Sequence, residues 1–76
     1  MHMKIVVIKK WCDDNITPLA WQRIVMKNLD ALKNTGLNIT ELSNPTDAME
    51  LNDVLVSLVK ESIKEVYQIE IPVHAL

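Results

Sequence analysis

Glycine is almost absent from this chain of 76 residues, and Gly36 is its only example. A glycine-rich phosphate-binding loop is therefore excluded. Phenylalanine is missing, and Cys12 is the only cysteine, so no intramolecular disulfide is available. No apolar run approaches the roughly 20 residues of a membrane-spanning helix, and the run at residues 5–8 is too short for a signal-peptide core. The sequence thus predicts a cytoplasmic protein with no membrane partner.

An excess of positive charge is also lacking. Eight Lys and Arg residues stand against ten Asp and Glu, for a net charge of −2, and the cations are scattered along the chain. A nucleic-acid binder usually carries a basic stripe, because phosphate neutralisation dominates its affinity. We therefore expect no nucleic-acid partner. The hydrophobic share of 49% is that of an ordinary globular protein, and we expect one small domain over residues 1–76.

The N-terminal segment has an apolar run at residues 5–8 and a more polar stretch at residues 11–16. Residues 5–8 are β-branched and apolar, with lysines on both sides, which predicts a strand over residues 3–10. Residues 11–16 contain two aspartates and one asparagine, Asn15, which favour turns, so we expect a connecting loop there.

Two helices are predicted from their end signals. Thr17 can cap a helix whose first residue is Pro18, and apolar residues at helical spacing follow over 18–34. Gly36 supplies a left-handed residue after the last turn.

The second helix follows a short interruption. Asn38 and Glu41 have the spacing of a capping box, which predicts a one-turn helix. Asn44 and Pro45 then predict a new start, and the apolar spacing extends a helix over 46–67.

The C-terminal residues change period. Residues 68–73 alternate polar and apolar side chains, which predicts a half-buried strand, and Pro72 limits it to an edge or an end. The predicted fold is α+β. It comprises an N-terminal strand, a two-helix antiparallel hairpin with a short one-turn helix between, and a C-terminal strand that pairs with the first.

Residues for catalysis or metal binding are sparse. Cys12 and His74 are a conceivable nucleophile and base, but we interpret Cys12 as a small packing residue and His74 as part of a frayed end. Cys12, Asp13 and Asp14 match no metal-ligand spacing. The acids lie in predicted loops and on polar helix faces. We therefore expect no enzyme, no cofactor and no metal.

A helix-turn-helix is the one nucleic-acid motif that the pattern suggests, with the turn at residues 39–43. Its recognition helix would begin with Asp47, Glu50 and Asp53, whose carboxylates repel phosphate. The same acids favour a protein partner with a basic surface, so we predict them to be protein-binding residues.

Four large or flexible side chains complete the candidate list. Trp21 lies on the apolar stripe of the first helix and is expected in the core. Trp11 follows the predicted strand, and it is either an exposed interface anchor or folded over the core edge. Met26 and Met49 are predicted to add adaptable surface beside it.

Residues 29–58 resemble bacteriophage tail assembly chaperones. Those proteins run from a helix through a segment like TGLNITEL, here from Thr35 to Leu42, to an Asn/Asp-Pro break and another leucine-rich helix. The features that carry the resemblance are Leu29, Leu32, Gly36, Leu37, Leu42, Asn44, Pro45, Leu51, Leu55 and Leu58. The resemblance implies binding of the tape-measure protein and of tail-tube subunits during assembly, without catalysis.

The sequence favours a small non-enzymatic protein-binding module. The alternatives are a small regulator of helix-turn-helix type, and an antitoxin-like or inhibitor-like protein that acts through a protein partner. Because the predicted core is thin and residues 5–8 are apolar on both faces, a homodimer through sheet edges is also expected.

Overall fold

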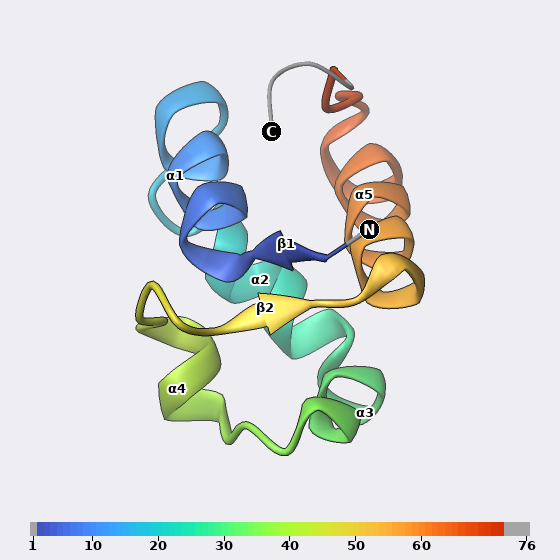
Figure 1. Cartoon of the computed structure of the whole chain (residues 1–76). Helices are drawn as coiled ribbons and strands as arrows, with labels where there is room; N and C mark the ends of the chain where they lie inside the picture. The colour runs from blue at the N-terminus through green and yellow to red at the C-terminus, as the bar shows by residue number, and fades with distance from the viewer. Residues whose placement is uncertain (1, 73–76) are drawn as a thin grey trace.

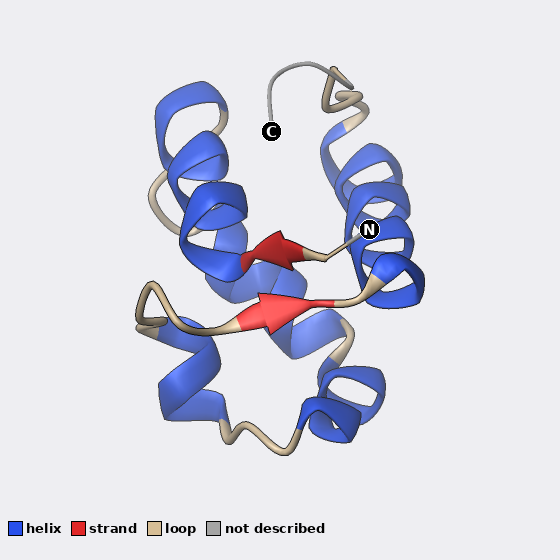
Figure 2. Ribbon diagram, in the orientation of Figure 1, coloured by secondary structure: helices blue, strands red, loops and turns tan. Residues whose placement is uncertain are grey.

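The computed structural model describes residues 2–72 and has an α+β fold, as predicted, with two short antiparallel strands and a mostly helical body (Figures 1 and 2). In chain order its elements are β1 (Met3–Lys4), α1 (Ile5–Asn15), α2 (Ala20–Lys27), α3 (Leu29–Leu32), the 3-10 helix η1 (Lys33–Thr35), α4 (Ile39–Ser43), β2 (Glu50–Leu51) and α5 (Asp53–Tyr67).

Helix α2 is the centre of the arrangement. It packs against α1, α4 and α5. In Figure 1, α1 and α5 stand on opposite sides of the molecule, the β1–β2 ribbon crosses between them, and α2 runs behind the ribbon. Below the ribbon in this view, α4 lies on the left and α3 on the right, and a loop joins them. The core is therefore enclosed by helices on several sides and by the small ribbon on one.

The core is built around Trp21, the largest fully buried side chain. Its indole Nε1–H donates to the carbonyl oxygen of Leu42 over 2.7 Å, which joins α2 to α4. A buried indole N–H needs such an acceptor, because an unpaired polar group in the core is costly. The predicted core role of Trp21 is confirmed. Around it lie Ile5, Ile8, Cys12, Ile24, Val25, Leu32, Leu42, Leu51, Val59 and Ile63, all at most 1% exposed.

The predictions of a strand over 3–10 and of a loop over 11–16 are wrong. Only Met3–Lys4 is extended, and α1 then runs to Asn15. Ile5, Ile8 and Cys12 are spaced by three and four residues, so one side of a helix buries all three. The strand propensity of β-branched residues is weak, and this burial against α2 outweighs it.

The sheet partner of the N-terminal strand also differs from the prediction. Met3 lies opposite Leu51 and Lys4 opposite Glu50 in the antiparallel pair, and the N–H of Ile5 donates to the carbonyl oxygen of Met49 over 3.0 Å. Residues 68–72 form no strand, and residue 73 lies outside the described residues.

The chain changes direction at the residue that follows the last turn of α5. Gln68 takes a left-handed conformation with φ 59°, which turns the chain away from the helix axis. Ile71 beyond it is nevertheless buried. The alternating pattern of residues 68–72 thus reflects burial of alternate side chains, without the backbone hydrogen bonds of a sheet.

The predicted helix over 18–34 is divided in the structure. The hydroxyl of Thr17 accepts from the N–H of Leu19, and α2 begins only at Ala20. The helix ends at Lys27 because Asn28 leaves the helical conformation. The chain continues as α3 and η1 up to Gly36, whose φ of 81° confirms the predicted left-handed stop.

The capping box at α4 is confirmed. The Asn38 carboxamide oxygen accepts from the N–H of Glu41 over 2.8 Å, and the Glu41 carboxylate accepts from the N–H of Asn38 over 3.1 Å. The predicted helix start at Asn44 and Pro45 is wrong. Asn52 caps α5 instead, by accepting from the N–H of Leu55 over 3.0 Å.

Candidate functional site

Cys12 is buried and unsuited to nucleophilic chemistry. Its side chain is fully buried, and desolvation raises the pKa of its thiol to about 11, with a further upward effect from the Asp13 charge and a downward one from Lys9. A thiol with this pKa is protonated at neutral pH, whereas the thiolate is the nucleophile. His74, the other half of the conceived pair, lies outside the described residues.

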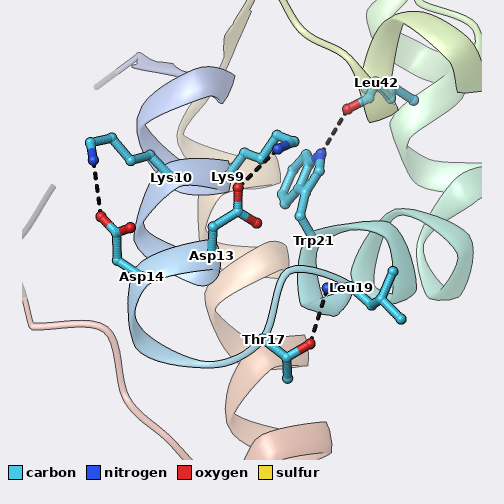
Figure 3. Close-up of polar contacts among 8 residues, drawn as sticks. All are labelled: Lys9, Lys10, Asp13, Asp14, Thr17, Leu19, Trp21 and Leu42. Atoms are coloured by element: carbon cyan, nitrogen blue, oxygen red, sulfur yellow. Dashed lines mark hydrogen bonds and ion pairs between the residues drawn. The ribbon is translucent and has the colours of Figure 1, made fainter.

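Asp13 and Asp14, considered above as turn formers or metal ligands, are paired within α1. The Lys9 ammonium donates to Asp13 over 2.9 Å and the Lys10 ammonium donates to Asp14 over 3.0 Å, as Figure 3 shows. Residues 2–72 contain no group of three His, Cys, Asp or Glu side chains placed to hold a metal ion. Within the same residues, no helix has the length and apolar character needed to cross a membrane.

Of two neighbouring hollows, the larger lies between α1 and the segment that follows α4, and the smaller lies between Lys9 of α1, the start of α2 and the end of α4. They have volumes of about 410 and 290 Å³, and they share Lys9 and Asn44 as walls. The Asp13 Oδ1 atom beside the larger hollow is buried, and no hydrogen-bond donor of the described residues reaches it. Because each lysine here already pairs with an aspartate, the hollows present nearly balanced charge and do not select an ionic ligand.

The three predicted acidic residues lie along one exposed segment. Asp47 is in the turn before β2, Glu50 is in β2, and Asp53 is in the first turn of α5. Glu50 lies opposite Lys4 in the ribbon, and one of its carboxylate oxygens is 3.7 Å from Nδ1 of His2. The structure thus keeps these acids on one segment, although only Asp53 begins a helix.

The helix-turn-helix arrangement is not formed as conceived. Residues 39–43 are themselves the short helix α4, and a strand separates α4 from α5. A recognition helix placed at 46–67 would require Asp47 and Glu50 in its first turns, and both lie outside α5.

The predicted apolar contact residues are not brought together. Trp11 is half-buried on α1, Met26 is 53% exposed on α2, and Met49 is half-buried before β2. Trp11 and Met49 both pack against the core cluster. Met26 alone among the three is largely accessible.

Met26 belongs to an exposed strip that the sequence reasoning did not identify. Leu19, seven residues earlier, is 69% exposed and lies on the same side of α2, since two helical turns separate the two residues. Arg23 lies between them, with its guanidinium carbon 5.9 Å from the centroid of the Tyr67 ring on α5. We call Leu19, Arg23, Met26 and Tyr67 the α2 strip. The seven-residue spacing of Leu19 and Met26, on the side away from Trp21, is the sequence signal that could have revealed it.

Comparisons of the chain with protein-family models, curated proteins and solved structures find no match. The resemblance to tail assembly chaperones stays a prediction.

Proposed function

We propose that this protein is a small non-enzymatic protein-binding module and that the α2 strip is its partner-binding surface. The observation that supports the proposal is the exposure of two large apolar side chains, Leu19 at 69% and Met26 at 53%, on either side of an arginine held against an aromatic ring. Single exposed apolar residues are common, but these two lie on one side of α2, with Leu19 at its N-cap and Met26 in its last turn.

The composition of the strip is that of an interface. Arginine, tyrosine and methionine are enriched where proteins bind one another, and arginine and tyrosine are frequent among the residues that dominate binding energy. Complete burial of a leucine or methionine side chain stabilises a complex by about 1.5–3 kcal/mol. Tyr67 also holds the Arg23 guanidinium in place, which lowers the conformational entropy lost on binding.

The charge of the strip indicates the chemistry of the partner. Arg23 forms no ion pair with a carboxylate of residues 2–72, and the neighbouring Lys27 is 3.7 Å from Glu65. A partner that fits therefore offers a carboxylate flanked by apolar side chains, as an amphipathic helix with an acidic residue at the edge of its apolar face does. If the resemblance over residues 29–58 holds, the partner class is a tape-measure or tail-tube protein.

The experiment is quantitative capture of partners from lysate of the native host with the purified protein as bait. Leu19→Asp and Arg23→Glu are expected to reduce the specific capture about tenfold or more, because each removes a central contact of the strip. Two matched controls are expected to leave it unchanged. Val54→Asp changes another apolar residue, 75% exposed, and Lys33→Glu reverses a cation away from the strip.

An opposite pattern would reject the α2 strip. Unchanged capture by Leu19→Asp and Arg23→Glu, with loss of capture by Asp47→Lys and Glu50→Lys, would place binding on the acidic segment. The partner would then be one with a basic surface.

A further inference from the structure

Helix α1 carries a second, partly exposed apolar surface at the edge of the core, which Trp11 contacts. Val7, Lys10, Trp11 and Asp14 recur at the three- and four-residue spacing that places them on one face. Val7 is 37% exposed and Trp11 is half-buried. These four residues and Asn15 line a hollow of about 200 Å³. We call this surface the α1 face.

The charges of the α1 face in one copy are complementary to those of the same face in a second copy. Lys10 lies one turn before Asp14, and both are well exposed, at 77% and 59% of their side-chain surface. When two copies of α1 run antiparallel about a twofold axis near Trp11, the Lys10 of each copy comes within a helical turn of the Asp14 of the other. A twofold interface requires this kind of self-matching surface.

We propose that the α1 face is a self-association surface, and that its occupant is the α1 face of a second copy of this chain. Val7 and Trp11 supply the apolar contact, and the hollow beside Trp11 receives a side chain of the other copy. The Lys10 and Asp14 charges determine the antiparallel orientation. Replacing the Lys10–Asp14 pair within one helix by Lys10–Asp14 pairs between the two copies adds little binding energy. Other orientations of the two helices are disfavoured, because they do not bring these opposite charges together.

The α1 face replaces the sheet edges as the predicted route to a dimer. Each strand is two residues long, and Ile5 and Ile8 are already buried within one chain. A standard stable interface buries about 800 Å² per partner, which is about a sixth of the 4759 Å² surface of this chain. A single helix of 11 residues covers less, so the dimer belongs to the weak class, with a dissociation constant of roughly 10⁻⁵ to 10⁻³ M.

The experiment is sedimentation equilibrium of the full chain from about 10 μM to 1 mM, with two single charge reversals and their mixture. Lys10→Glu and Asp14→Lys each place like charges across the twofold axis, and each is expected to weaken dimerisation about tenfold. An equimolar mixture of the two variants is expected to dimerise again, because each reversed residue then faces its opposite. Val7→Asp should also weaken the dimer while both original charges remain.

Lys33→Glu is the matched control, since it makes the same charge change off α1, and its dimerisation should equal that of the unmodified chain. A single-chain mass at every concentration would overturn the proposal. Dimerisation of Lys10→Glu or Val7→Asp at the level of the unmodified chain, or failure of the mixture to recover it, would also overturn it. Circular dichroism of each variant separates loss of association from loss of folding. The α2 strip is untouched in all of them, so this proposal stands or falls independently of the proposed function.

Discussion

Single side chains determine where the helices of this protein begin and end. Asn38 and Asn52 each accept a backbone N–H at the start of a helix, and Gly36 ends η1 in a left-handed conformation. The roles of Asn38 and Gly36 follow from local chemistry and were predictable. Asn52 was not, because Asn44 followed by Pro45 is an equally good start signal, and the sequence does not rank the two.

Gly36→Ala should lower the free energy of unfolding by about 1 kcal/mol. The φ of 81° is strained for alanine, and a Cβ at this position would meet no atom within 4 Å, so backbone strain is the whole of the expected cost. Urea denaturation followed by circular dichroism measures the change.

Gly36→Asn is the control for that measurement, since asparagine tolerates the left-handed region better than alanine does. It should lose less stability than Gly36→Ala. Equal losses for the two variants would show that the cost does not arise from the backbone conformation.

At the scale of secondary-structure elements, burial decided between helix and strand. The apolar run at residues 5–8 fits both, but a helix places Ile5 and Ile8 together with Cys12 in the core and adds the Lys9–Asp13 and Lys10–Asp14 pairs. The i, i+4 spacing of those pairs was visible in the sequence and favoured a helix. The break between α2 and α3 at Asn28 was not visible, and the Asn28 side chain has its hydrogen-bond partner in the distant α5.

That partner is Ser62, which is 4% exposed. The Asn28 carboxamide donates to the carbonyl oxygen of Ile24 over 3.0 Å and to the Ser62 hydroxyl over 2.8 Å. A polar residue at the helix break thus satisfies a buried hydroxyl that lies 34 residues away in sequence.

Asn28→Ala should lower the free energy of unfolding by about 1–3 kcal/mol, because the buried Ser62 hydroxyl loses its side-chain partner. Ser62→Ala should cost less, since the half-buried Asn28 carboxamide is partly hydrated. The double variant should be more stable than the sum of the two single losses implies. A double-mutant cycle by urea denaturation measures the coupling, and additive losses would contradict it.

At the scale of the whole molecule, charge is nearly balanced and locally paired. Beside the two pairs in α1, Lys64 lies 2.8 Å from Glu70, and this hydrogen-bonded pair raises the pKa of Lys64 and lowers that of Glu70. Both groups are fully exposed, so the pair adds little to stability. With Lys27 beside Glu65, four of the eight Lys and Arg side chains of the described residues lie within 4.0 Å of a carboxylate.

The isolated protein should therefore show no binding to duplex DNA at physiological salt. Non-specific affinity rests on counterion release, and each neutralised phosphate needs a nearby cation. The net charge of −2 opposes such contacts. A fluorescence anisotropy titration with mixed-sequence duplex tests this, and a salt-dependent dissociation constant at or below roughly 1 μM would contradict it.

The sequence by itself determined the α+β class, the core role of Trp21, the stop at Gly36, the capping box at Asn38 and the end of α5 at Tyr67. Each depends on interactions within a few residues or on the period of apolar side chains, and both can be recognised from neighbouring residues in the sequence. Of the candidate binding residues, Met26 is the apolar one that the structure leaves largely exposed.

The tertiary structure alone decided the rest. It made residues 5–15 a helix, paired β1 with β2, and divided the predicted helix over 18–34 at Asn28. It also placed Tyr67 of α5 beside Arg23, between the exposed Leu19 and Met26. These outcomes depend on which distant segments bury one another's surfaces, and burial of that kind outweighs the fraction of a kcal/mol by which local propensities differ.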